Sequence, residues 1–193
     1  MSQDEVLERL RSAIANYRPT GLVEPEREKA KATVRERALS LLDYRARSRH
    51  ELQQRLLKAE YEPETVEEVL DDLQEVGLLD DAAFAQEWVS QRARRRGKST
   101  RVLARELRDK GVGAAERREA LEQISEAEEE ATARAVARKK ARGIRGVPEG
   151  RHERDKDVRR VLGALARRGF SEGMSLTLAR EAVEERYAEL RAA

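Results

Sequence analysis

Cysteine is absent from this chain, and histidine occurs only twice, as His50 and His152. The first absence excludes disulfides and thiolate metal sites, and the second argues against a histidine-based metal or catalytic cluster. The sequence also lacks a glycine-rich phosphate-binding loop. Because these absences remove the usual catalytic constellations, we expect a protein that is not an enzyme and that uses no metal and no cofactor.

Proline is scarce as well, occurring only as Pro19, Pro25, Pro63 and Pro148. A helical tract between Pro63 and Pro148 therefore meets no proline break. No apolar run approaches the roughly 20 residues that span a bilayer. The first residues include acids and lack the apolar core of a secretory signal. We therefore expect a cytoplasmic protein without membrane contact.

Charge, in contrast, is abundant: 40 % of residues are charged and 39 % are hydrophobic. Leu, Ala, Glu and Arg are common, and such residues lose little rotamer freedom in a helix. The net charge of +2 hides strong segregation. Eleven acids and no Lys or Arg lie between Glu60 and Glu87, whereas nine bases and two acids lie between Arg92 and Lys110. These blocks indicate partners more directly than the net charge does.

Helical periodicity is nearly continuous from Lys31 onward. Ser48 with Glu51, and Ser125 with Glu128, fit the capping box that begins a helix. The apolar stripes of the expected helices comprise Ala38, Leu41 and Leu42; Leu52, Leu56 and Leu57; Val66, Val69, Leu70, Leu73 and Val76; Phe84, Trp88 and Val89; Leu103 and Leu107; Ala120, Leu121 and Ile124; Ala131, Ala135 and Val136; Val158, Val161, Leu162 and Leu165; and Met174, Leu178, Ala182 and Val183.

The same helical plan recurs along the chain. A shift of 51 residues maps Ser48 onto Ser99, and a further shift of 58 maps Gly111 onto Gly169. Because caps and glycines match as well as leucines, we interpret the pattern as an internal repeat rather than a chance match of apolar positions. The sequence thus predicts an all-α protein of three tandem three-helix repeats forming an elongated, curved array, since each unit is too small to bury its own apolar face. The expected segments are an N-terminal extension, partly helical or flexible, at 1–31, and repeats at 32–79, 80–125 and 126–193.

Two features that follow Gly77 admit a functional interpretation. Adjacent Asp80 and Asp81 resemble paired catalytic carboxylates, but adjacent helical residues do not face each other, so capping of the next helix is favoured. Phe84 and Trp88 share a helical face and have the chemistry to stack on unpaired bases. We favour a core anchor for the second repeat instead.

An acidic stripe lies opposite the apolar residues of one expected helix. Its members are Glu64, Glu67, Glu68, Asp71 and Glu75. Like charges at this spacing repel, and no base on the same helix offsets them. Three alternatives stay open: neighbouring repeats supply Arg and Lys, a basic partner surface binds the stripe, or the face is simply solvated.

The basic runs are the best candidates for interaction with a partner. Guanidinium groups bind phosphates bidentately, and Arg101, Arg105 and Arg108 share one helical face. From composition alone, binding and a solvated surface are both open. The candidate partner-binding and nucleic-acid-binding residues are Arg92, Arg94, Arg95, Arg96, Lys98, Arg101, Arg105, Arg108, Arg138, Lys139, Lys140 and Arg142.

Four fragments in order resemble the family of the bacterial regulatory protein RecX. They are Arg47 to Leu52; Gly77 to Asp81 with Phe84-Ala85, Trp88-Val89 and Arg92; Leu107 with Lys110-Gly111; and Arg167 to Ser171. The resemblance covers residues 32–190. One departure is Glu60-Tyr61, where the family often has Lys-Gly, and it leaves the first repeat's turn in question.

This resemblance implies an all-helical protein of three three-helix repeats. It also implies a modulator, usually an inhibitor, of the RecA recombinase, acting in homologous recombination, DNA repair and the SOS response. Such proteins bind RecA filaments on single-stranded DNA and suppress ATP hydrolysis and strand exchange. The expected partners are RecA, its single-stranded DNA filaments and DNA phosphates, and we expect a monomer. The rival hypothesis is a helical, sequence-specific DNA-binding transcriptional regulator, because short helices joined by tight turns also suit helix-turn-helix docking.

Overall fold

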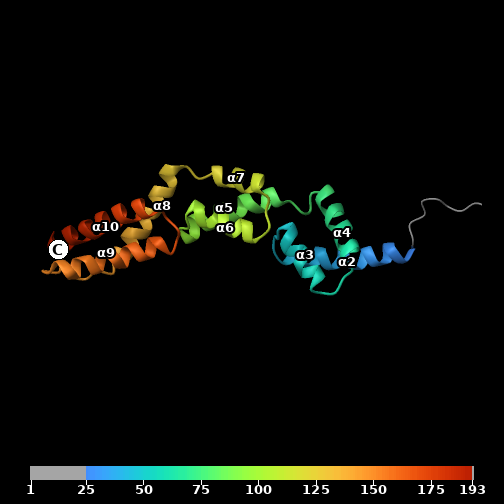
Figure 1. Ribbon diagram of the computed structural model, residues 1–193, viewed down its shortest axis with the longest axis horizontal. Helices are drawn as coiled ribbons and strands as arrows, with labels where there is room; N and C mark the ends of the chain where they lie inside the picture. Colours follow the sequence, from blue (N-terminus) through green and yellow to red (C-terminus); the bar gives the residue numbers. More distant parts are fainter. Residues whose placement is uncertain (1–24, 193) are drawn as a thin grey trace, which may run out of the picture.

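The computed structural model describes residues 25–192, and the regular secondary structure in this range is entirely helical. Three consecutive bundles of three helices follow one another along the long axis of the molecule (Figure 1). The predicted all-α class and three-helix repeats are confirmed. Most of the expected N-terminal extension lies outside the described residues. None of the helices in this range is long and apolar enough to cross a membrane.

The first bundle consists of α2 (Pro25–Tyr44), α3 (Arg49–Leu57) and α4 (Pro63–Glu75). Helix α2 begins before residue 31, so the expected boundary between extension and first repeat falls inside this helix. Pro63 occupies the first turn of α4, where its missing N–H costs nothing. The core of the bundle consists of Val34, Ala38, Leu52, Leu56, Val66, Val69, Leu70, Leu73 and Leu79.

The second bundle consists of α5 (Asp81–Arg96), α6 (Thr100–Asp109) and α7 (Ala114–Glu122). Phe84 is buried in its core, and Trp88 packs against it with a ring-centroid separation of 5.5 Å. This packing supports the interpretation of the two aromatic residues as a core anchor. The other buried core residues are Ala85, Val89, Leu103, Leu107, Val112 and Ala120.

The third bundle consists of α8 (Glu126–Ala141), α9 (Arg151–Ala166) and α10 (Glu172–Ala192). The apolar face predicted for α8 is wrong, because Ala131 and Ala135 are exposed. Alanine occurs on several sides of this helix, so its position does not mark the buried side. The buried core consists of Ala133, Ala137, Ala141, Ile144, Val161, Leu165, Phe170, Leu178, Ala179, Ala182, Val183 and Tyr187.

Side-chain caps begin the helices where the sequence predicts them. Ser125 and Glu128 form a complete capping box, in which the Ser125 N–H donates to the Glu128 carboxylate at 2.9 Å. Ser48 accepts a hydrogen bond from the Glu51 N–H at 3.2 Å. This second box is only half formed, because the Glu51 carboxylate turns toward basic residues at the boundary with the next bundle.

The expectation that a single unit is too small to bury its own apolar face is wrong, because each bundle has its own hydrophobic core. The bundles are joined through the ends of their second helices. Ser48, which caps the start of α3, donates its hydroxyl to the Lys110 carbonyl at the end of α6 at 2.6 Å. The N–H of Ser99, which caps the start of α6, donates to the Arg168 carbonyl just after α9 at 3.0 Å. Helices α3, α6 and α9 therefore lie head to tail, which brings the positive end of one helix dipole to the negative end of the next.

Both junctions also use a carboxylate from the first helix of the following bundle. The N–H of Arg49 in α3 donates to Asp81 in α5 at 2.7 Å. The N–H of Thr100 in α6 donates to Glu129 in α8 at 3.0 Å. Each carboxylate therefore satisfies an amide that the helix itself leaves without a partner. The internal repeat therefore includes the contacts between bundles as well as the helices within them.

Glycine is required where a second helix ends at a junction. Gly111 and Gly169 adopt φ angles of +74° and +84°, and a Cβ atom on them would overlap His50 and Val102 of the preceding bundle. Glu60 holds the equivalent turn after α3 with φ 63°. No bundle packs against this turn in the described chain, so a side chain is sterically tolerated there. The departure at Glu60 therefore leaves the backbone of the turn unchanged.

Four of the five acids in the stripe of α4 are paired within their own bundle, as is Asp72 of the same helix, whereas Glu75 makes no ion pair within residues 25–192. Helix α2 carries bases at every fourth position, and these lie beside acids with the same spacing on α4. The pairs are Arg27 with Glu64 and Glu68, Lys31 with Glu68, Arg35 with Asp72, and Arg49 of α3 with Glu67 and Asp71. Bases therefore reach the stripe from the same repeat, an alternative that the sequence interpretation did not include.

We predict that Gly111→Ala lowers the free energy of unfolding by about 2 kcal/mol or more, because it adds an overlap with His50 to the strain of the left-handed backbone. Gly77→Ala is the matched control, since Gly77 has φ +71° and open space around its Cβ position. Its expected cost is about 1 kcal/mol from strain alone. Urea unfolding measures both variants, and equal losses would contradict the role assigned to the junction.

We also predict that Glu60→Gly raises the free energy of unfolding by about 0.5–1 kcal/mol, because glycine adopts the left-handed conformation without the steric cost that glutamate bears. Ala59→Gly is the control one residue away. It introduces the same flexibility where φ is not positive, so it should destabilise the protein. A loss of stability in both variants would show that Glu60 is not strained.

Candidate functional site

Five arginines line a single cleft between the second and third bundles. Arg101, Arg105 and Arg108 come from α6, Arg117 from α7, and Arg167 from the end of α9. The cleft measures about 560 Å³, and its remaining lining residues are Val102, Ala104, Ala166 and Gly169. No acidic residue is among these lining residues. We call this site the arginine cleft, and it is a strong concentration of one charge sign.

Backbone carbonyls orient two of these side chains. The Nε of Arg101 donates to the Gly169 carbonyl at 3.1 Å, and Arg117 donates to the Val112 carbonyl. Each of these guanidinium groups keeps further N–H donors for another ligand. The other three side chains, those of Arg105, Arg108 and Arg167, are exposed and make no hydrogen bond or ion pair with any residue between 25 and 192.

The predicted cluster of Arg101, Arg105 and Arg108 is thus brought together, but the sequence interpretation missed Arg117 and Arg167. The signal for Arg167 was present in the repeat register. Arg167 lies two residues before Gly169, which matches the glycine that closes the first junction. Arg117 lies among acids on the short helix α7, where the local pattern gives no indication of a shared cleft.

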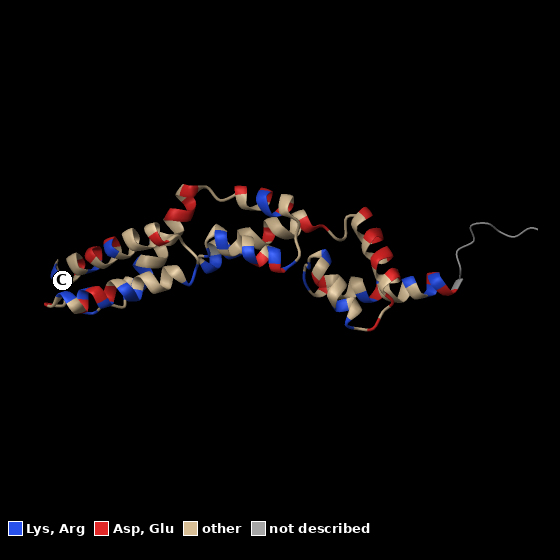
Figure 2. Cartoon of the chain, viewed as in Figure 1, with Lys and Arg blue, Asp and Glu red and all other residues tan. Residues whose placement is uncertain are grey.

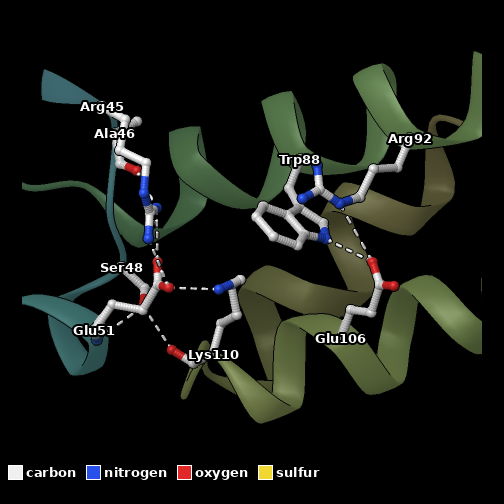
Figure 3. Close-up of polar contacts among 8 residues, drawn as sticks. All are labelled: Arg45, Ala46, Ser48, Glu51, Trp88, Arg92, Glu106 and Lys110. Atoms are coloured by element: carbon white, nitrogen blue, oxygen red, sulfur yellow. Dashed lines mark hydrogen bonds and ion pairs between the residues drawn. The ribbon is translucent and has the colours of Figure 1, made fainter. Parts of the chain in front are cut away.

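Arg92 and Lys98 belong to a different network, which turns away from the arginine cleft. Both pair with Glu106 of α6, Arg92 through its Nε at 3.4 Å. The indole Nε1 of Trp88 donates to the same carboxylate at 3.2 Å (Figure 3). A single glutamate therefore binds two cations and the indole, and these two bases are less available for a partner than predicted.

The ring of Trp88 is itself in contact with cations. The guanidinium carbon of Arg92 lies 3.2 Å from the ring centroid, and the Lys110 ammonium lies 4.6 Å from it. Such contacts are favourable because the face of the ring is electron-rich. They also occupy the surface that a nucleobase would need, so the structure favours a packing role for Trp88 over base stacking.

The remaining predicted residues lie at the end of α5 and at the end of α8. Arg95 and Arg96 are exposed at the end of α5, and the side chain of Arg94 lies outside the described part. Arg138 makes a bidentate ion pair with Glu185 of α10 at 2.8 and 2.9 Å. The others are Lys139, Lys140 and Arg142, of which Lys140 is half-buried and the other two are exposed.

Asp80 and Asp81 act in capping and joining. Asp80 accepts hydrogen bonds from the N–H groups of Ala82 and Ala83 at 2.8 and 2.9 Å. Burial raises the pKa of the Asp81 carboxyl group, and the N–H of Arg49 partly offsets this effect. Residues 25–192 contain no group of three or more potential ligands that could hold a metal ion. These contacts favour a structural role for both aspartates.

The first and second bundles differ in the sign of the charge that they carry most prominently. Figure 2 shows acidic residues along α4 and basic residues along the lower side of the middle bundle. The acids of α4 are largely paired by bases of α2 and α3, whereas three cleft arginines have no acidic partner within residues 25–192. The cleft beside α6 and the end of α9 therefore gathers unneutralised positive charge in one place.

Glu51 connects the first two bundles electrostatically (Figure 3). Its carboxylate accepts hydrogen bonds from Arg45 at 3.1 and 3.2 Å and from Lys110 at 2.5 Å. Partial burial tends to raise the pKa of Glu51, but these hydrogen bonds outweigh burial and lower the pKa to about 2. The ionised carboxylate therefore stabilises the junction that positions α6.

We predict that Glu51→Gln lowers the free energy of unfolding by about 1–2 kcal/mol at neutral pH. Because the folded-state pKa of about 2 lies below the ordinary 4.5, the contribution of Glu51 is complete above pH 4.5 and is lost as the pH falls toward 2. The difference in free energy of unfolding between wild type and variant should therefore shrink as the pH falls from 4.5 toward 2. Urea unfolding at several pH values tests this, with the exposed Glu119→Gln as control; a pH-independent difference would refute it.

Comparisons with known proteins agree with this architecture. Family models described as the first and second three-helix domains of RecX match residues 35–73 and 80–121. Regulatory protein RecX of Corynebacterium efficiens is 55 % identical over 197 residues, covering 98 % of this chain and 94 % of that protein. Regulatory protein RecX of Streptomyces coelicolor is 48 % identical over 147 residues, covering 76 % of each.

Solved structures give the same result. A crystal structure of regulatory protein RecX superposes with a TM-score of 0.68 at 26 % identity, covering 91 % of this chain and 86 % of that chain. The crystal structure of RecX from Lactobacillus salivarius, at 20 % identity, shares the fold with a TM-score of 0.68 over 82 % of this chain and 99 % of that chain. From its repeats, its junctions and these relatives, the chain belongs to the RecX family of regulatory proteins.

Proposed function

We propose that this protein regulates RecA by binding RecA filaments on single-stranded DNA and by suppressing ATP hydrolysis and strand exchange. The observation that carries the proposal is the arginine cleft, in which three exposed guanidinium groups have no partner within the described chain. A nucleoprotein filament is an extended polyanion, and such charge attracts it. Membership of a family of regulatory proteins supports action by binding rather than by catalysis.

The shape of the array suits an extended partner. The three bundles lie in a row along the long axis of the molecule (Figure 1). Each bundle has its own core, so the contacts made by one bundle do not require rearrangement of another. We propose that a monomer lies along the filament, with its basic residues contacting DNA phosphates or acidic RecA surface. The protein would then act within the cytoplasm, where RecA and its DNA are found.

A sequence-specific transcriptional regulator is the rival proposal, and two contacts weigh against it. Helix-turn-helix proteins insert the first residues of a recognition helix into the major groove. Here the starts of α3 and α6 are covered by the following bundle through Ser48 and Ser99. The third helix of the first bundle, α4, carries no lysine or arginine and so offers phosphate no cationic contact of its own.

RecA ATPase on single-stranded DNA provides the test. Wild type added at stoichiometric amounts should lower the rate and should co-sediment with the filaments. The triple variant Arg105→Ala, Arg108→Ala, Arg167→Ala should need about tenfold more protein for half-maximal inhibition, since three exposed contacts of roughly 0.5 kcal/mol each amount to that factor. No inhibition and no co-sedimentation of wild type would refute the proposal.

A matched control removes the same charge elsewhere. Arg55, Arg159 and Arg180 are exposed, lie on α3, α9 and α10, and make no ion pair within residues 25–192. Their triple alanine variant should inhibit like wild type. Equal weakening of the two triple variants would assign the effect to net charge rather than to the cleft. A preference for one duplex sequence over others in competition would favour the transcriptional regulator.

A further inference from the structure

The arginine cleft occupies only one of the two equivalent junctions. In the repeat register, the positions of Arg101, Arg105 and Arg108 at the second junction correspond to His50, Gln54 and Leu57 at the first. Counting back from the matched glycines, Arg167 corresponds to Asp109. At both junctions a serine at the start of one second helix contacts a carbonyl at the end of the next, and the following N–H donates to a carboxylate, yet only the second junction has these arginines. Arg101 contributes to the second junction through Gly169. The side chains of Arg105, Arg108 and Arg167 make no hydrogen bond or ion pair within residues 25–192, so joining the bundles does not explain them.

Placing five arginines around one cleft is electrostatically unfavourable for the protein alone. Five guanidinium groups surround one cleft without an acid among the lining residues, so their charges repel each other. An anion that enters the cleft removes this repulsion and gains hydrogen bonds. The carbonyls of Gly169 and Val112 hold Arg101 and Arg117 in place before any ligand arrives. The cleft is thus partly organised for an anion with several charges.

The lining favours phosphate over a protein surface. Protein partners are usually anchored by aromatic or large aliphatic side chains in apolar pockets, and this cleft offers only Val102, two alanines and a glycine beside the arginines. Planar guanidinium groups match phosphate oxygens bidentately. The lining residues include no aromatic side chain, so the cleft has no aromatic platform for stacked bases. These features fit recognition of a sugar-phosphate backbone without reading its sequence.

We propose that the arginine cleft binds successive phosphates of one nucleic-acid strand and that this strand bridges the second and third bundles. The proposal deepens the proposed function, on which it rests for its biological setting, by assigning the cleft to DNA rather than to RecA. Arg105 and Arg108 contact the strand from α6, and Arg167 contacts it from the end of α9. Binding is independent of base sequence and strongly dependent on salt.

Fluorescence anisotropy of the full-length protein with a labelled oligothymidylate of about 15 nucleotides tests the proposal without RecA. Wild type should bind, and Arg105→Ala, Arg108→Ala, Arg167→Ala should weaken binding at least tenfold. The slope of log affinity against log salt should fall by about 2, because each phosphate contact on a single strand contributes about 0.7. The Arg55, Arg159, Arg180 triple variant should match wild type in slope and affinity. Equal binding by wild type and the cleft variant would overturn the proposal.

Two further measurements test whether the ligand is phosphate rather than carboxylate and whether the site spans both bundles. A labelled polyglutamate peptide of equal charge should bind much more weakly than the oligonucleotide; tighter binding would make the cleft a carboxylate site for a protein partner. Arg167→Ala alone should weaken oligonucleotide binding; an unchanged affinity would confine the site to α6 and overturn the bridge. Thermal unfolding of each variant confirms that the fold is intact.

The outcomes also distinguish this proposal from the proposed function. Inhibition of RecA by a wild-type protein whose DNA affinity does not depend on the cleft would overturn only the assignment to phosphate. Cleft-dependent DNA binding without any effect on the RecA ATPase would overturn only the proposed regulation of RecA.

Discussion

The contact on which the rest of this structure depends is the one between the end of one second helix and the start of another. Three small cores do not merge, so the relative positions of the bundles are set by a few polar contacts. The carbonyls of Lys110 and Arg168 meet the caps Ser48 and Ser99, and glycines at the ends of α6 and α9 allow the close approach. Without these joints, the arginines of α6 and α9 would not line a common cleft.

Much of this architecture is predictable from the sequence, because helix caps, leucine spacing and glycines are local signals. The all-α class and the three-helix repeats follow from them. The joints are not local: the hydroxyl of Ser48 reaches a carbonyl 62 residues away. The matched positions of Ser99 and Gly169 indicate that these residues matter, but the periodicity within one helix does not reveal which neighbour they contact.

At the candidate site, too, the local sequence does not reveal which residues contact each other, as the basic run after Trp88 shows. Arg92 and Arg105 look equivalent in sequence, yet Arg92 pairs with Glu106, whereas Arg105 is exposed without a partner in the described chain. The difference arises because Glu106 lies on the side of α6 that faces α5. The acids of α4 are the opposite case. Considered alone they form an acidic stripe open to a partner, but Lys31 of α2 pairs with Glu68, and Arg49 of α3 pairs with Glu67 and Asp71.

The strained turn at Glu60 has a consequence for assembly. Both junctions have a glycine at the end of one second helix and a serine at the start of the other. At the outer ends of the array these residues are replaced: Glu60 follows α3, and Gly150 precedes α9 without a side-chain cap. The contacts that join neighbouring bundles are therefore not available in the same form at the two outer ends of the described array.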